Sequence, residues 1–511
     1  MKRAAIWNLM FVLICCLFSN CTGQMNDAGV RQPAVAGKFY PADPVKLKSA
    51  LNYFFEDAVK QQQRLKPLGI IVPHAGYIYS GRIAADAFNQ AKNFEYDVVV
   101  ILGTNHTTAG FDKVSVYPNG AYSTPLGSAV VDEGITGALL KEDSDCVTDL
   151  RPQETEHSVE VQVPFVQYLF PKARIVPIVV GTPDVDLCSK LGKALAKILK
   201  EKNVLIVASS DLSHYPAYDD AVITDKNTLD VIATMNTKDI SKKLDAQMHS
   251  GVRSLVTCAC GEAPILAMIT AVKELGGNYA SVISYANSGN TLIGTDDRVV
   301  GYGAVAFYRT GKDKPVISVN KMDTLMNAAS ELSVQDKVNL LKLARLTIEQ
   351  YLNSETLPLL SELTPAMKQR RGAFVTLRKN KELRGCIGTM SDELQLFNVI
   401  GRMALSAALN DNRFQPLEVS ELPVTEIEIS VLTPPVKVSS DADIVLGRDG
   451  IILKNKGKQA VFLPQVATET GWGKEKFLTQ LCFKAGLSAN DWKTATLFTF
   501  RAEVFSEADF K

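Results

Sequence analysis

Four short apolar runs, rich in Val and Ile, constrain most strongly how this chain can fold. Each run is bounded by Gly, Pro, Ser or Asn, as buried strands usually are. Stretches with helical periodicity, such as GRIAADAFNQAK, lie between the runs. Strands that alternate with helices predict an α/β domain with a largely parallel sheet. The four runs are residues 67–73, 96–105, 173–181 and 203–211.

A change of pattern near residue 310 divides the chain. At 511 residues the chain is too long for one ordinary core. The α/β pattern ends near Thr310, and a segment with helical periodicity starts near Ser333 after a polar stretch. Hairpin-like segments such as GAFVTL and ELRGCIGTM follow. We therefore predict an α/β domain over 30–312, a linker over 313–332 and a smaller α+β domain over 333–511.

The first residues have the features of a leader for export. Lys2 and Arg3 precede an apolar stretch, residues 6–18, that is too short to span a membrane and has the length of a signal-peptide core. The segment LFSNC resembles a lipobox and places Cys21 where a bacterial lipoprotein is acylated. We expect a signal peptide over 1–24 and an exported protein of the cell envelope. A plain cleaved signal and an uncleaved anchor are the alternatives, and a cytoplasmic location follows if the segment is not a leader.

The charge balance excludes some classes of partner. The chain has 55 basic and 55 acidic residues, so it offers no bulk attraction for nucleic acid or for an anionic membrane surface. We expect no nucleic-acid partner, and membrane contact only through the leader or its lipid. With 46% hydrophobic and 22% charged residues, the composition is that of a globular protein.

The cysteines beyond the leader do not form a disulfide framework. They are widely spread and include no CxxC pair. Burial or a metal ion would shield such thiols in an exported protein. These cysteines are Cys146, Cys188, Cys258, Cys260, Cys386 and Cys482.

Histidine is scarce and its placement is informative. The chain has five histidines, and three of them, His74, His106 and His214, follow predicted strands. Ligands of open α/β sheets bind beyond the carboxyl ends of the strands, where these three side chains would project. His157 opens a predicted helix in ETEHSVEVQVPF, and only His249 lies in an unremarkable context.

Each of these residues also has a purely structural interpretation. A single histidine at a strand end is more often a hydrogen-bonded structural residue than a ligand. His157 fits the first turn of a helix whose N-terminus Glu154 and Glu156 complement. Asp211 fits the cap of the turn in SSDLSHY. The shared placement of three histidines at strand ends favours a binding site.

The segment CACGEAP adds a candidate sulfur ligand. Cys260 precedes a predicted helix, whose N-terminus favours the thiolate and therefore metal binding or nucleophilic reactivity. Cys258 lies two residues away and would point the same way in an extended segment, or be an inert buried thiol. Imidazole and thiolate donors suit Fe, Cu or Zn rather than Mg or Ca.

Five motifs of the first domain, in this order, resemble the Memo family. The resemblance covers residues 35–307, and the family is similar in fold to the class III extradiol ring-cleaving dioxygenases. It implies that His74, His106 and Cys260 bind the metal, described as iron or copper. It also implies that Asp211 and His214 line the same pocket. We expect these two residues to be catalytic and His157, Glu156 and Tyr77 to belong to the pocket. The five motifs are VPHAGYIYSG, LGTNH, ETEHSVEVQVPF, ASSDLSHY and CGEAP.

One position departs from the dioxygenase pattern. In those enzymes a carboxylate completes the iron site, whereas the matching position here is Cys260. This difference argues against ring cleavage. The resemblance implies redox chemistry and leaves the substrate, a small molecule or a peptide, open.

The second domain resembles the AMMECR family over about 335–508. Its motifs include LRGCIGT, ALNDNRFQPL and FLPQVATETGW. The candidate functional loop consists of Arg384, Gly385, Cys386 and Gly388, where a guanidinium and free backbone N–H groups would bind an anion. The alternative is a hairpin whose glycines permit tight packing and whose Cys386 is buried.

A fusion of these two families resembles the AmmeMemoRadiSam system. The third member of that system is a radical S-adenosylmethionine enzyme. Because this sequence has no CxxxCxxC motif, that enzyme would be a separate partner protein.

Two functions from different classes follow. The first is a metal-dependent redox enzyme in which His214 and Asp211 transfer protons. The second is a binding module that uses the same pocket for a peptide or a small anion, without turnover.

Overall fold

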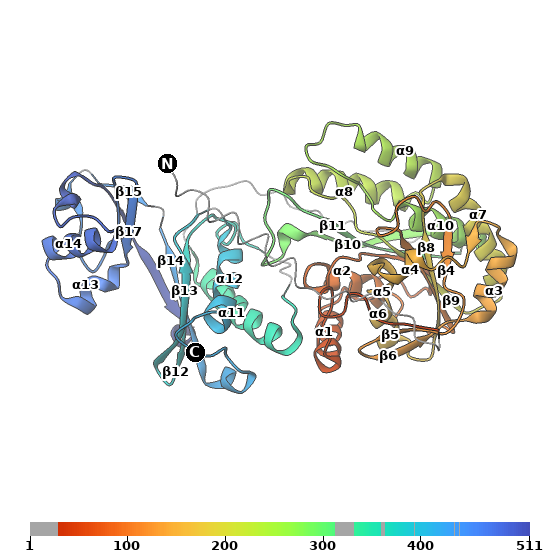
Figure 1. Ribbon diagram of the computed structural model, residues 1–511, viewed down its shortest axis with the longest axis horizontal. Helices are drawn as coiled ribbons and strands as arrows, with labels where there is room; N and C mark the ends of the chain where they lie inside the picture. Colours follow the sequence, from red (N-terminus) through yellow and green to blue (C-terminus); the bar gives the residue numbers. More distant parts are fainter. Residues whose placement is uncertain are drawn as a thin grey trace. The chain divides into compact units, whose positions relative to one another are not determined.

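The computed structural model describes residues 29–311, 332–358, 363–392, 394–433, 435–438 and 440–510 (Figure 1). The predicted leader and, apart from Leu332, the predicted linker lie outside these residues. The chain divides into two compact units, the first built mainly from residues before the predicted linker and the second mainly from residues after it. No helix in the described ranges is long and apolar enough to cross a membrane.

An eight-stranded sheet forms the centre of the first unit, as far as the chain is described. Its strand order is β10-β11-β2-β9-β3-β8-β4-β7. The four predicted apolar runs form β2, β3, β8 and β9, so these predictions are confirmed. The eight strands of the sheet are β2 (Pro67–Val72), β3 (Val98–Thr104), β4 (Val114–Val116), β7 (Cys146–Val147), β8 (Arg174–Val180), β9 (Val204–Ser209), β10 (Tyr279–Asn287) and β11 (Gly301–Tyr308).

The sheet is mixed, which corrects the prediction of a largely parallel one. Strands β2, β9, β3 and β8 are parallel and form its centre. Strands β10 and β11 form an antiparallel pair that extends the sheet beside β2, and β4 is antiparallel to β8. Antiparallel edge strands on a parallel centre are common in large α/β sheets. The site depends on the parallel centre, which is the part that the sequence predicts.

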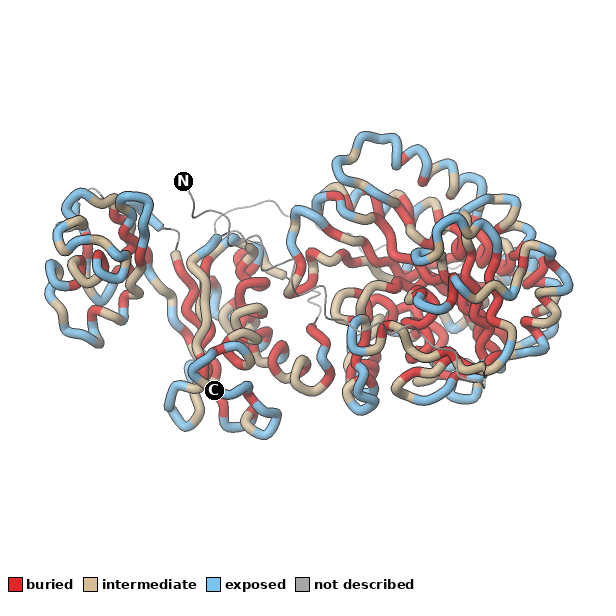
Figure 2. Tube along the Cα trace, viewed as in Figure 1, coloured by how far each residue is buried: buried red, intermediate tan, exposed pale blue. Residues whose placement is uncertain are grey.

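Both faces of the central strands are covered. Along β3, Val98, Val100 and Leu102 join a core cluster with residues of the helices α7 and α10, while Val99 and Ile101 between them are also fully buried. Figure 2 shows the buried residues concentrated along the strands of this unit. Burial on both faces explains why these strands are continuously apolar rather than alternating.

Ten helices and a small sheet complete the described part of the first unit. The small sheet has the order β1-β5-β6 and consists of β1 (Val30–Arg31), β5 (Ala121–Thr124) and β6 (Gly127–Val130). The helices are α1 (Pro44–Glu56), α2 (Tyr77–Asn89), α3 (Glu133–Glu142), α4 (Arg151–Glu154), α5 (His157–Glu160), α6 (Val163–Leu169), α7 (Val185–Leu199), α8 (Tyr218–Ala233), α9 (Thr237–Met248) and α10 (Glu262–Glu274).

A buried ion pair ties β1 to the short helix α5. Arg31 Nη1 lies 2.7 Å from Glu160 Oε2, and both side chains are buried. Glu160 also accepts hydrogen bonds from the Tyr40 hydroxyl and from the backbone N–H groups of Ala34 and Val35. Arg31 further donates to the carbonyl of Glu156 at 2.9 Å. The start of α5 is therefore fixed to the N-terminal segment by buried, charge-assisted hydrogen bonds.

The second unit is α+β, as predicted. Its hairpin β12–β13 turns at Asn380 and Lys381, which both have positive φ, as the tightest hairpin turns require. Two four-stranded sheets have the orders β13-β12-β14-β19 and β15-β18-β16-β17 among the described residues. The elements are α11 (Val334–Ser354), β12 (Ala373–Lys379), β13 (Glu382–Thr389), α12 (Leu396–Leu409), β14 (Thr425–Leu432), β15 (Val436–Lys437), β16 (Gly450–Asn455), β17 (Lys458–Phe462), α13 (Pro464–Thr470), α14 (Lys474–Lys484), β18 (Thr496–Phe500) and β19 (Ala502–Ser506).

Removing the buried carboxylate of Glu160 is expected to destabilise the first unit strongly. Glu160→Ala leaves the Arg31 guanidinium buried without its counter-charge, which costs about 3–5 kcal/mol. The exposed pair of Asp149 with Arg151 provides the control, because Asp149→Ala costs at most about 1 kcal/mol. Urea unfolding of the purified variants measures both values. A Glu160→Ala cost as small as that of the control would contradict a stabilising role for the buried pair.

Candidate metal centre

The predicted histidines at strand ends lie at one edge of the sheet. His74 follows β2, His106 follows β3 and His214 follows β9, and these three strands are neighbours in the order β2-β9-β3. The ring centroids of His74 and His106 are 5.1 Å apart. His157, the first residue of α5, lies 5.2 Å from His74 and 4.7 Å from His106 by the same measure.

A glycine allows α5 to approach β3. A Cβ atom at Gly103 would lie 2.5 Å from Ser158 Oγ, so a larger residue would push the two elements apart. The Ser158 hydroxyl instead donates to the carbonyl of Thr104 and accepts from its N–H. This close contact brings His157 next to His106.

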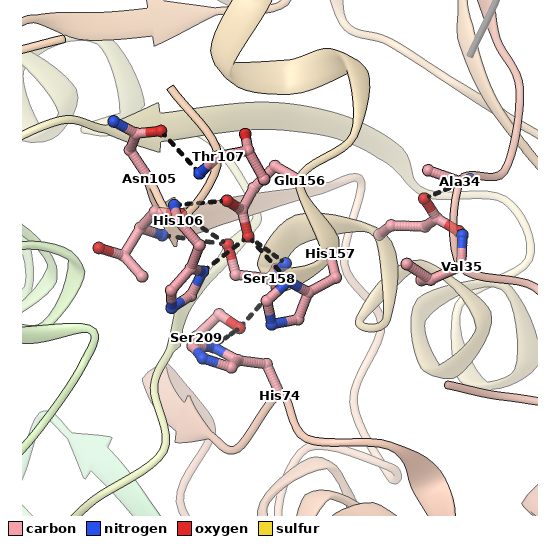
Figure 3. Close-up of polar contacts among 12 residues, drawn as sticks. Ala34, Val35, His74, Asn105, His106, Thr107, Glu156, His157, Ser158 and Ser209 are labelled. Carbon is pink, nitrogen blue, oxygen red and sulfur yellow. Dashed lines mark hydrogen bonds and ion pairs between the residues drawn. The ribbon is translucent and has the colours of Figure 1, made fainter. Parts of the chain in front are cut away.

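The hydrogen bonds of Ser209 fix the protonation of His74. The Ser209 hydroxyl donates its one hydrogen to the carbonyl of Ser158 at 2.6 Å and accepts from Gln162 Nε2 at 2.9 Å. Toward His74 Nδ1, at 3.1 Å, Ser209 Oγ therefore acts as an acceptor (Figure 3). His74 carries its proton on Nδ1, and the lone pair of its Nε2 is directed at Cys260 Sγ, 3.0 Å away.

Glu156 lies beside Nδ1 of the other two rings. Its Oε1 lies 2.9 Å from His106 Nδ1 and 3.3 Å from His157 Nδ1, and Figure 3 shows both rings beside this carboxylate. Glu156 also accepts from the backbone N–H groups of His106 and Ser158. Because an ionised carboxylate only accepts, His106 Nδ1 carries a proton and donates it to Glu156.

Burial keeps His74 and His157 neutral, and hydrogen bonding keeps Glu156 ionised. Burial lowers the pKa of His74 well below its usual range and lowers that of His157 to about 4. Burial alone would raise the pKa of Glu156, but the hydrogen bond and charge of His106 and its other partners lower it to about 2. At neutral pH His74 and His157 are therefore neutral, the form in which histidine binds metals.

Two groups of residues have the spacing of a metal site. The ligand atoms within each group lie within 4.8 Å of one another. The first group is His74, His106 and His157, and the second is His74, Asp211 and Cys260. His74 belongs to both. The predicted set of His74, His106 and Cys260 is thus divided between two groups that share His74.

Close backbone packing places Cys260 at the site. A Cβ atom at Gly261 would lie 2.4 Å from the carbonyl of Ser209, and the Gly261 N–H donates to Ser210 Oγ. Burial raises the pKa of the Cys260 thiol well above its usual value, so burial outweighs the predicted effect of the helix N-terminus on the metal-free thiol. Cys258 contacts Leu244 and Met248 instead, as an inert buried thiol.

The two predicted catalytic residues adjoin this cluster. Asp211 Oδ1 accepts from the backbone N–H groups of His74 and Ala75, so it organises the turn after β2. Burial raises the pKa of Asp211 to about 7. His214 Nε2 is buried without a hydrogen-bond partner among the described residues. Burial lowers the pKa of His214 to about 4, with contributions from His106 and His157.

Tyr77 has the contacts of a core residue. Its hydroxyl donates to the carbonyl of Val161 at 2.7 Å, and its ring packs against Tyr40, Phe54 and Phe165. These contacts favour packing over the predicted place in a pocket wall. The residue supports the segment that follows α5.

The loop of the second unit is engaged in internal contacts. Arg384 Nε and Nη2 both donate to the carboxylate of Glu421, at 3.0 and 2.8 Å, and the Cys386 N–H donates to Asp411. A Cβ atom would lie 2.1 Å from the carbonyl of Ala407 at Gly385, and 2.1 Å from the ring of Phe374 at Gly388. This geometry favours the tight packing of the glycines over an anion site, but Cys386 is half-buried rather than buried as the packing interpretation expects.

Sequence reasoning missed the residues that orient the rings. Ser209 and Gln162 determine which nitrogen of His74 is protonated, and Gln162 is itself held by the carbonyl of Pro73. The sequence could have indicated this role only through a serine, Ser209, at the end of a predicted strand. Such a pattern does not show which atom the serine hydroxyl contacts.

The fold and the site define an α/β protein with a cluster of histidines and one cysteine at the carboxyl ends of parallel strands. A family model described as Memo-like protein matches residues 31–306, and a model described as AMMECR1 matches residues 341–505. The chain belongs to the Memo-like family, and an AMMECR1 domain follows its Memo-like domain.

Several relatives match the Memo-like part. A MEMO1 family protein of Desulfurococcus amylolyticus is 37% identical over 291 residues, which are 54% of this chain and 99% of the relative. A MEMO1 family protein of Methanosarcina mazei is 39% identical over 283 residues, with coverages of 54% and 98%. Among solved structures, an uncharacterized protein from Pyrococcus horikoshii is 34% identical and covers 33% of this chain and 90% of its own, with a TM-score of 0.31.

The stability of the metal-free protein is expected to fall between pH 6.5 and pH 4, in part because of His214. The folded pKa of His214 is about 4 against an ordinary value of 6.5, so the unfolded chain binds more protons in this window. The contribution is fully present above pH 6.5 and is lost as the pH falls, by about 3 kcal/mol at most. His214→Asn should reduce this loss in urea unfolding at a series of pH values.

The exposed His249 supplies the control. His249→Asn should leave the pH dependence unchanged. A His214→Asn profile parallel to the wild-type profile would contradict the buried, neutral state of His214.

Proposed function

We propose that this chain is a metal-dependent redox protein whose ion is bound by His74, His106 and Cys260. One observation carries the proposal. The Nδ1 atom of His74 is held by Ser209, so its Nε2 lone pair is presented to Cys260 Sγ at 3.0 Å. Imidazoles that are oriented and clustered beside a thiol are the donor set of a transition-metal site.

The donor set fits iron or copper, and zinc as well. Neutral imidazole nitrogens and a thiolate suit all three ions, whereas Mg and Ca prefer oxygen ligands. Metal binding would also lower the pKa of the Cys260 thiol, because a coordinating thiol is deprotonated. His106 supports this fit, since its Nδ1 donates to Glu156, the hydrogen bond to a carboxylate that metal-binding histidines typically make.

Asp211 and His214 are the residues that we propose to transfer protons. A bound iron or copper ion would supply redox chemistry and act as a Lewis acid. Asp211, with a pKa raised to about 7 by burial, can hold or release a proton near neutral pH. His214 Nε2, which has no hydrogen-bond partner within the described chain, would accept a proton from a substrate atom or hold it in place.

The substrate class follows only in part from these residues. A pocket similar to that of the extradiol dioxygenases is consistent with the α/β fold and with histidines at the strand ends. Cys260, in the place of a carboxylate, would leave the site with a softer donor, which suits redox chemistry on a small molecule or peptide better than ring cleavage.

The metal content of purified variants tests this proposal. We expect about one ion per wild-type chain after anaerobic purification, and a clear loss in His74→Ala and Cys260→Ala, because each removes a donor atom. His249→Ala and Cys258→Ala are matched controls that should retain the ion, since one side chain is exposed and the other contacts Met248. Elemental analysis measures all five proteins.

Equal metal content in all five proteins would contradict the proposal. A full complement of metal without oxygen consumption on aromatic or thiol substrates would instead support the second candidate, a binding module for a peptide or small anion. Loss of stability in Cys260→Ala with the metal retained would assign the cysteine a structural role.

We also propose that the chain is exported and acylated at Cys21, which lies outside the described residues. The features that support this are the basic start, the short apolar stretch and the LFSNC segment. A separate radical S-adenosylmethionine enzyme is a proposed functional partner, on the basis of the two families that the chain combines.

A labelled fatty acid tests the acylation. Cells that express the chain with an alkyne-modified fatty acid should label the wild-type protein and leave Cys21→Ser unlabelled. Cys146→Ser is the control and should be labelled as strongly as the wild type, because Cys146 is buried in the first unit. Equal labelling of Cys21→Ser would contradict acylation at this residue.

A further inference from the structure

We infer that His157 is a third imidazole ligand of the metal centre, beyond the three ligands proposed above. The inference rests on the proposed function and extends it to a residue that the sequence alone places only in the pocket. Among the described residues, His157 belongs to the one candidate group that consists of imidazoles alone.

Spacing is the first observation. Metal–nitrogen and metal–sulfur bonds of about 2.0–2.3 Å place the ligand atoms of one ion no more than about 4.6 Å apart. The ligand atoms of His74, His106 and His157 lie within 4.8 Å of one another, close to this limit, whereas His106 and Cys260 belong to different groups. The three imidazoles therefore have the spacing of a site before any side chain moves, as the group of His74, Asp211 and Cys260 also does.

Orientation is the second observation. Glu156 Oε1 is hydrogen-bonded to Nδ1 of His106 at 2.9 Å and lies 3.3 Å from Nδ1 of His157. With Nδ1 of each ring beside this carboxylate, Nε2 is the atom left for a metal, as it is on His74, whose Nδ1 contacts Ser209. A single carboxylate can therefore orient two histidines as metal ligands.

The packing of the ring is the third observation. The His157 ring lies against Phe39, with centroids 4.7 Å apart, and is stacked with the ring of His106 at an interplanar angle of 25°. It is nearly perpendicular to the ring of His74, at 89°. The side chain of His157 is 20% exposed and that of His106 30%, so the cluster is open to an entering ion.

The chemistry of the completed set follows from its charges. Three imidazoles bring no negative charge to offset a bound cation, whereas Cys260 and Asp211, which form the second group with His74, would offset it when ionised. The centre would therefore combine an imidazole group and a thiolate–carboxylate group that share His74. Such a set suits iron, copper and zinc.

Copper binding by the full chain tests the inference. The wild type, His157→Ala, Glu156→Gln and the control His249→Ala are titrated with Cu²⁺ against a competing chelator. Electron paramagnetic resonance then reports the nitrogen atoms bound to the ion. We expect His157→Ala to weaken binding by about 10-fold or more and to lose the coupling of one nitrogen. His249→Ala should match the wild type.

Glu156→Gln separates orientation from ligation. It keeps every imidazole but replaces the charged acceptor that orients two of them, so binding should weaken while the number of coupled nitrogens is retained. Melting of the metal-free proteins shows whether each variant is folded. A purely structural His157 would lower the melting temperature of the metal-free chain without changing the copper spectrum.

The outcomes distinguish this inference from the proposed function. Wild-type affinity and unchanged nitrogen coupling in His157→Ala would overturn the assignment of His157 and leave a metal centre at His74, His106 and Cys260. Absence of stoichiometric copper, iron or zinc binding by the wild type would overturn both.

Discussion

Fixed hydrogen-bond acceptors behind the histidine rings are the constraint on which the site depends. Ser209 gives its only hydrogen to the carbonyl of Ser158 and must accept from His74, whereas Glu156 is hydrogen-bonded to His106 Nδ1 and lies 3.3 Å from His157 Nδ1. Each ring thus has its Nδ1 atom beside an acceptor, which leaves Nε2 as the atom for a metal. Without this arrangement the rings would be close together, but their Nε2 atoms would not be oriented.

The fold supplies these acceptors from separate elements. Ser209 ends β9, the central neighbour of β2 and β3, and Glu156 caps the short helix α5. The backbone of Glu156 is in turn held by Arg31, whose guanidinium is paired with Glu160 in the interior. A buried ion pair is weak evidence for stability in general. Here it fixes the position of the carboxylate that orients two histidines, which gives the pair a specific structural consequence.

The sequence predicts the fold and the location of the site well. Continuous apolar runs indicate strands that are buried on both faces, and residues just beyond such strands necessarily meet at one edge of a parallel sheet. This is why the neighbourhood of His74 and His106 was predictable from spacing. The antiparallel strands β10 and β11 were not, because pairing direction depends on tertiary contacts rather than on local pattern.

The details of the site depend on side-chain contacts that no spacing reveals. The sequence alone predicts that His157 lies in the first turn of a helix. Its approach to His106 depends on Gly103 and on the carboxylate of Glu156 that lies beside both rings. From the sequence we expected the guanidinium of Arg384, which lies beside two glycines, to be free to bind an anion. In the structure this guanidinium instead donates two hydrogen bonds to the carboxylate of Glu421. The raised pKa of the Cys260 thiol was equally unpredictable from the sequence, because it results from burial in the folded chain.

The protonation of the rings tests the central claim most directly. Nitrogen-15 NMR of the metal-free chain at neutral pH distinguishes a protonated ring nitrogen from one with a lone pair. Histidine-to-glutamine variants assign the signals of His74, His106 and His157. All three should carry the proton on Nδ1 and a lone pair on Nε2. A proton on Nε2 of His74 or His106, or a doubly protonated ring, would contradict the account.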